Sequence, residues 1–285
     1  MSRYRTLTRA LPIAAVAFAL PLLAAGPGLA QGKLDARYAA SLAGLPIGNG
    51  AWVIDISQDQ FTAAASGMTS GLLRLFSSGH GSAASRGSIR SGNLIPSSFG
   101  SSLTTEKKTE ELRLVLNAGN VKEYAIDPAP PPAPERVPVT EAHRRGVVDP
   151  MSAALIRVAG NGDYLVPEAC NRTLPIFDGR LRFDLKLEFK RMDQVKAEKG
   201  YQGPVVVCSV YFSPLAGHIP DRAVVKYLAA QRDMEVWLAP LSGTRVLVPF
   251  RISIPTPFGL GVLQATQFVS AQSAPRAAAT SAKVQ

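Results

Sequence analysis

Residues 180–190 read Arg-Leu-Arg-Phe-Asp-Leu-Lys-Leu-Glu-Phe-Lys. Every second residue is apolar, and the residues between are polar or charged. Strict alternation over this length predicts a β-strand with one buried face and one solvated face. Sheets with one solvated face are normally antiparallel, so the segment indicates an antiparallel sheet.

The same period of two recurs on both sides of this stretch. After a turn at 200–203, alternate residues of 204–212 are apolar, and this pattern points Cys208 inward. Weaker copies predict further strands in residues 34–45, 51–58, 60–68, 111–116, 121–126, 235–239, 245–254 and 262–269. We therefore predict a mainly β protein, with a single curved antiparallel sheet that forms an open barrel or β-spiral.

Helix signals are few. Residues 71–76 fit one helical turn, and residues 221–232 fit a longer segment. Asp149 and Pro150 are typical of the cap and the first position of another helix. The fold should therefore carry two or three short helices.

The first 30 residues carry the pattern of a secretory signal peptide. Arg3, Arg5 and Arg9 precede an uncharged apolar run, and small residues flank Leu29 where a signal peptidase would cleave. A permanent membrane anchor is the alternative, but the apolar core is short and interrupted by proline. We expect cleavage after Ala30, delivery to the periplasm, and no transmembrane span in the mature chain.

The remaining chain is predicted to form one domain. Residues 31–270 should be a single β-rich domain, and residues 271–285 a disordered tail of small and polar residues. Residues 127–138 contain six prolines and should form an extended linker within the domain.

Composition and charge exclude several classes of protein. With 46% hydrophobic residues, the chain is too apolar for intrinsic disorder. Its net charge of +10 falls to +7 without residues 1–30, which hold three of the 31 basic residues and none of the 21 acidic ones. This diffuse surplus suits anionic head groups or envelope polymers, and we expect no nucleic-acid partner.

Cys170 and Cys208 are the two cysteines of the chain. In an oxidising compartment such an isolated pair is predicted to form a disulfide. Two free thiols or a redox pair are the alternatives, and the absence of a Cys-x-x-Cys motif disfavours redox catalysis.

Six segments carry a shared pattern. They are PERVPVT at 134–140, RGVVDPMSAAL at 145–155, CNRTLPIFDGR at 170–180, GYQGPVVVC at 200–208, AGH at 216–218 and MEVWLAP at 234–240. Together they resemble the alphaproteobacterial branch of an exported family known as domain of unknown function 3108. The resemblance covers most of residues 34–270 and implies a periplasmic protein. It implies no activity, cofactor or catalytic residue.

Motifs for catalysis or metal binding are missing from the sequence. His80, His143 and His218 lie in unrelated segments, and neither a Gly-x-Ser-x-Gly elbow nor a His-Glu-x-x-His motif occurs. We therefore expect no enzymatic activity, no cofactor and no metal site.

The apolar strand faces suggest a binding function. A long sheet with few helices must fold on itself, meet a second sheet or hold a ligand. A curled sheet that stays open would have an apolar groove on its inner face, suited to an acyl chain. Core packing is the alternative role for the groove candidates, which are Phe183, Leu185, Leu187, Phe189, Phe212, Trp237 and Phe250.

We accordingly predict a non-enzymatic periplasmic protein of the cell envelope that binds a lipid or a lipidated partner in a curved β groove. The alternative is a structural or interaction protein that recruits an envelope protein through its edge strands. A hydrolase ranks third. The sequence does not set an oligomeric state.

Overall fold

A computed structural model describes residues 31–71 and 78–272. The predicted signal peptide at 1–30 lies outside these residues, as do residues 72–77 of the predicted helical turn and residues 273–285 of the predicted tail. The last strand continues to Gln272, slightly past the predicted start of the tail.

Most of the described chain is β-strand. The strands are β1 (Gly32–Leu42), β2 (Leu45–Ile56), β3 (Gln60–Thr69), β4 (Gly79–Arg90), β5 (Asn93–Thr105), β6 (Thr109–Asn117), β7 (Asn120–Asp127), β8 (Ile156–Arg157), β9 (Arg172–Phe177), β10 (Arg182–Lys196), β11 (Lys199–Gly200), β12 (Gln202–Ala216), β13 (Met234–Pro240), β14 (Val246–Thr256) and β15 (Gly259–Gln272).

All of these strands belong to one sheet. Its order is β7-β6-β5-β4-β3-β2-β1-β15-β14-β13-β12-β10-β9, with the short β8 and β11 attached to β14 and β15. Every pair along this path is antiparallel, and the short β11–β15 pair is parallel. The end strands β7 and β9 do not pair with each other. The predicted open, curved antiparallel sheet is confirmed.

Tight two-residue turns connect β1 to β2, β4 to β5 and β6 to β7. Ala43–Gly44, Ser91–Gly92 and Ala118–Gly119 each place two consecutive residues at positive φ. Two such residues form the hairpin turn whose twist matches the strands on either side. These turns keep β1 to β7 in the order of the chain.

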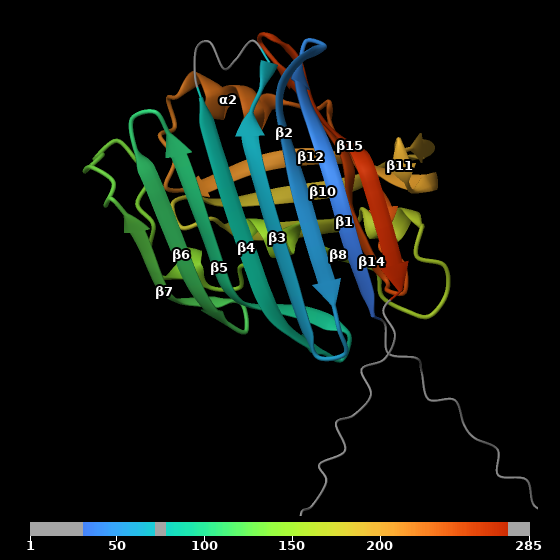
Figure 1. Ribbon diagram of the computed structural model, residues 1–285. Coiled ribbons are helices and arrows are strands. Elements are labelled where there is room, and N and C mark those ends of the chain that lie inside the picture. The colour runs from blue at the N-terminus through green and yellow to red at the C-terminus, as the bar shows by residue number, and fades with distance from the viewer. Residues whose placement is uncertain (1–30, 72–77, 273–285) are drawn as a thin grey trace, which may run out of the picture.

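The sheet curls so that its two halves face each other. In Figure 1, β10 and β12 cross behind β3 to β5 at a steep angle. A hydrophobic cluster fills one end of the space between the halves, and its fully buried members include Leu34, Ile54, Phe61, Val248 and Phe250. This end of the interior is a packed core.

Three strands of the second half are buried on both faces. Residues 205–208 of β12, 236–240 of β13 and 246–250 of β14 are buried without interruption. Val206, Cys208 and Leu238 pack on the second face against Ile156 and Ala169. The predicted solvated face is therefore absent here, because residues 156–170 cover it.

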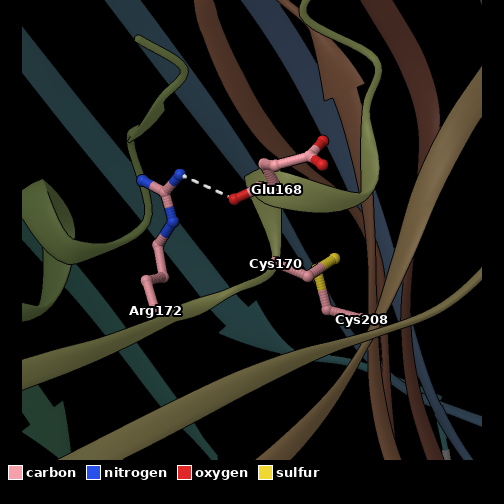
Figure 2. Close-up of a disulfide and its surroundings, with 4 residues drawn as sticks. All are labelled: Glu168, Cys170, Arg172 and Cys208. Carbon is pink, nitrogen blue, oxygen red and sulfur yellow. Dashed lines mark hydrogen bonds between the residues drawn. A yellow bond between two sulfur atoms is a disulfide. The ribbon is translucent and has the colours of Figure 1, made fainter.

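The disulfide joins this cover to the sheet. Cys170 and Cys208 are bonded, with Cα atoms 5.5 Å apart and both residues fully buried. Figure 2 shows the bond beside Arg172, whose Nη2 lies 3.5 Å from the carbonyl oxygen of Glu168. Arg172 also donates from Nη1 to the carbonyl oxygen of Arg157 at 2.9 Å. The predicted disulfide is present.

The helices are short. They are α1 (Pro150–Ala153), α2 (Ala223–Ala230) and the 3-10 turns η2 (Ala142–Arg144) and η3 (Pro167–Ala169). The helix expected after Asp149 ends at Ala153 after about one turn. Within the described residues, the search for a helix long and apolar enough to cross a bilayer found none.

Residues 128–138, the proline-rich segment, contain neither helix nor strand. The segment lies against the end of β12, where the Val137 N–H donates to the His218 carbonyl at 2.9 Å and the Gly217 N–H donates to the Val137 carbonyl at 2.8 Å. The segment therefore connects β7 to the second half of the sheet and is hydrogen-bonded to the end of β12. We call residues 128–138 the proline-rich strap.

Candidate functional site

The second half of the sheet holds an apolar pocket on the face where Ile156 and Leu238 pack. Its volume is about 380 Å³, and it is lined by residues of β9, β10 and β12 to β14, with α1 and α2 as further walls. The principal side chains are those of Phe183, Leu185, Leu187, Phe212, Leu228 and Ile252. We call this space the apolar pocket.

The structure brings four of the seven predicted groove residues together. Phe183, Leu185, Leu187 and Phe212 line the apolar pocket, where the rings of Phe183 and Phe212 are 5.4 Å apart. Period-two spacing found these four because β10 and β12 pair regularly over this stretch.

The other three lie elsewhere. Phe189 is 37% exposed and lies just before a one-residue shift in the pairing of β10 with β12. Phe250 is fully buried in the packed core. Trp237 lies between two arginines, with Arg251 at 4.9 Å and Arg191 at 5.4 Å from its ring.

Sequence reasoning missed α1, Leu228 and Ile252 as walls of the pocket. Strict alternation along the strand predicted at 245–254 puts Ile252 on the same face as Phe250, but Phe250 is an extra residue between Arg251 and Pro249, which pair with Trp237 and Leu238. Pro249 was the available signal, because a proline inside a strand often marks a bulge.

A second pocket adjoins the first. It has a volume of about 460 Å³ and shares Ala154, Pro249 and Ile252 with the apolar pocket. The Tyr38 hydroxyl, at its wall, donates to the Pro249 carbonyl at 2.7 Å, and burial raises the pKa of Tyr38. The apolar space therefore continues from β10 and β12 toward β1 and β2.

A buried polar cluster holds α1 in place as a wall. The Asp149 carboxylate accepts the Ser152 N–H at 2.9 Å and the Ser85 hydroxyl at 3.1 Å. The hydroxyls of Ser85 and Ser152 lie 2.8 Å apart. Burial raises the pKa of Asp149, and hydrogen bonds from Ser152 and Ser85 oppose part of that rise. The cluster therefore ties α1 to β4.

We expect Asp149→Ala to lower the free energy of unfolding by about 1–2 kcal/mol, since the cap of α1 is lost. Asp149→Asn is the matched control, because asparagine also caps helices.

The pH dependence of stability tests the charge of Asp149. Because burial raises the pKa of Asp149, the free energy of unfolding of the wild type falls as pH rises above the usual range of aspartate. The stability of Asp149→Asn relative to the wild type should therefore increase from pH 3 to pH 7. Urea unfolding at both pH values measures this. A constant difference between wild type and Asp149→Asn would contradict the role of the charge.

The three histidines lie on different elements of the fold. His80 lies on β4, His143 lies in η2, and His218 follows β12. Among residues 31–71 and 78–272, the search for three or more clustered His, Cys, Asp or Glu side chains with metal-binding geometry found none.

Comparison with known proteins gives a family without an assigned activity. A family model described as "Protein of unknown function (DUF3108)" matches residues 37–266. No curated protein matches the chain. Among solved structures, the chain is similar to a β-barrel-like protein of the domain of unknown function DUF1849 from Brucella abortus. That similarity has a TM-score of 0.44 and 8% identity, over 86% of this chain and 99% of the other.

Proposed function

The chain belongs to the DUF3108 family, and from this premise we propose that it is a non-enzymatic periplasmic protein of the cell envelope that binds an apolar ligand, a lipid or a lipidated partner, in the apolar pocket. The observation that carries the proposal is the pocket itself, which is about 380 Å³ in volume and lined almost entirely by apolar side chains.

The size of the pocket favours a binding site over a packing defect. Protein interiors contain few voids larger than a water molecule. Pockets for small ligands occupy about 300–1,000 Å³ and are mostly apolar. By contrast, Phe61, Phe250 and Phe268 are almost completely buried in the hydrophobic core. The chain therefore packs these side chains closely and leaves an apolar space beside β10, β12 and α1.

The lining residues support binding rather than catalysis. Glu235 is the charged residue of the lining, and it pairs with Lys190 at 2.5 Å and Arg191 at 3.2 Å. Ser253 is the hydroxyl-bearing residue of the lining, and no histidine accompanies it there. Within the described residues, the lining thus offers no nucleophile beside a free general base.

Two features support the periplasm as the location. Disulfides such as Cys170–Cys208 persist in oxidising compartments. The first 30 residues have the pattern of an export signal. Both are consistent with an envelope protein that meets lipid or lipidated molecules outside the cytoplasm.

A second candidate is a structural or interaction protein of the envelope. It is favoured by β7, an edge strand for which the described residues supply β6 as its one pairing partner. A partner could add a strand at this edge. Crosslinking that recovers one stoichiometric protein, together with an empty apolar pocket, would favour this alternative.

Binding of N-phenyl-1-naphthylamine, an uncharged apolar fluorophore, tests the proposed function. Leu185→Trp should fill the apolar pocket and weaken binding at least tenfold, since tryptophan would occupy space that the ligand needs. Leu215→Trp is the matched control, because Leu215 is on β12 but 42% exposed and outside the pocket lining. Fluorescence titration gives the Kd of each variant. The proposal fails if the wild type does not bind the fluorophore and native mass spectrometry of gently purified protein finds no lipid.

A further inference from the structure

The apolar pocket continues into a positively charged recess. The recess has a volume of about 280 Å³ and shares Phe183, Phe212 and Leu228 with the apolar pocket. Its charged and titratable lining residues are Arg136, Arg180, Arg182, Arg222, His218 and Asp178. We call this space the basic recess.

Three separate parts of the chain build the basic recess. Arg136 comes from the proline-rich strap and donates from Nη1 to the Gly217 carbonyl at 2.6 Å. Gly217 has φ +81° and packs so closely on Arg180 that a Cβ atom would overlap the Arg180 carbonyl oxygen. This close approach of the strap and the end of β12 to the start of β10 gathers the arginines.

Two of the four arginines already have acidic partners. Arg180 pairs with Glu110 at 2.6 Å, and Arg182 pairs with Asp184 at 2.6 Å. Within the described residues, neither Arg136 nor Arg222 lies within ion-pair distance of a carboxylate. These two charges are therefore free to meet an anion.

The one carboxylate of the lining is occupied. Asp178 Oδ1 accepts the backbone N–H groups of Arg180 at 2.8 Å and Leu181 at 2.7 Å. Arg180 Nε is in turn a buried donor with no acceptor among the described residues. Buried donors normally have partners, so the polar groups of the basic recess are incompletely satisfied by the protein.

From this juxtaposition we propose that the ligand is a single-chain fatty-acid anion, with its acyl chain in the apolar pocket and its carboxylate in the basic recess, held by Arg136 and Arg222. Guanidinium groups bind carboxylates through strong, charge-assisted hydrogen bonds. The basic recess beside the apolar pocket suits a ligand with one anionic head group, and Asp178 in the lining favours a monoanion over a doubly charged phosphate. This inference rests on the proposed function and specifies its ligand.

Displacement of N-phenyl-1-naphthylamine by laurate and by 1-dodecanol tests the proposal, because the two share a chain and differ in charge. The double variant Arg136→Gln/Arg222→Gln should weaken laurate binding at least tenfold and leave 1-dodecanol within about twofold. Arg222→Glu serves as a second variant, since Arg222 is exposed and its loss should leave the fold intact. Arg113→Gln/Arg145→Gln is the charge-matched control, with side chains 80% and 69% exposed.

The outcomes separate this inference from the proposed function. If laurate and 1-dodecanol both displace the fluorophore and the recess variants change neither, the carboxylate assignment is overturned and the apolar pocket still binds ligands. If dodecyl phosphate binds tenfold more tightly than laurate, the head group is a phosphate and the carboxylate assignment is overturned. If the wild type does not bind the fluorophore at all, the proposed function has failed first.

Discussion

Phe250→Ala is expected to lower the free energy of unfolding by about 3–5 kcal/mol, the range for removing a buried phenylalanine from a core. Phe250 has no exposed surface and packs against Tyr201 and Phe268, with ring centres 6.5 and 5.5 Å away. The cavity left between the two halves of the sheet would have no side chain free to fill it. Urea unfolding followed by tryptophan fluorescence gives the difference.

Phe189→Ala is the matched control, because it removes the same side chain from a site that is 37% exposed. It should cost less than about 1 kcal/mol, as is usual for surface positions. Equal losses in the two variants would contradict the difference in burial between the two phenylalanines. Neither variant should change the Kd of the apolar fluorophore by more than about twofold, because neither residue lines that pocket.

Removal of the disulfide by Cys170→Ala/Cys208→Ala is expected to lower the free energy of unfolding by about 4 kcal/mol. The two cysteines are 38 residues apart in sequence, and closing a loop of this length restricts the unfolded chain by about that amount. Urea unfolding of the oxidised wild type and the double variant measures the loss. The reduced wild type is the control, and it should resemble the variant.

A loss below about 1 kcal/mol would contradict this role of the bond. It would mean that hydrophobic contacts alone hold residues 156–170 on β12 and β13. A loss well above 5 kcal/mol would indicate that the cover separates from the sheet and exposes Val206 and Leu238, which are almost completely buried.

The alternation in residues 180–190 was sufficient to predict a β-strand in an antiparallel sheet. Together with the alternation in residues 204–212, it was also sufficient for Phe183, Leu185, Leu187 and Phe212, because β10 and β12 pair regularly there. Alternation did not foresee the exposure of Phe189, and it gave the wrong relation between Phe250 and Ile252. In β14 the cause is a bulge, because the extra residue Phe250 changes the face of the side chains beyond it.

Contacts between distant segments could not be read from local patterns. The strap at 128–138 has the composition of a linker, yet Arg136 reaches Gly217 and helps to form the basic recess. Asp149 was recognised as a helix cap, and the structure adds its contact with Ser85 on β4. Both depend on how the sheet curls, which sums small twists over many strands.

Because β1 pairs with β15, the sheet can be completed only after the last strand has formed. Gly32 lies opposite Gln272, so the first described strand finds its second neighbour only when the last one is available. In a chain synthesised from its N-terminus, one edge of β1 stays unpaired until then and can pair wrongly with another molecule. Such long-range closure makes assembly slow. A chaperone that shields this edge until β15 has formed would therefore raise the yield of folded protein.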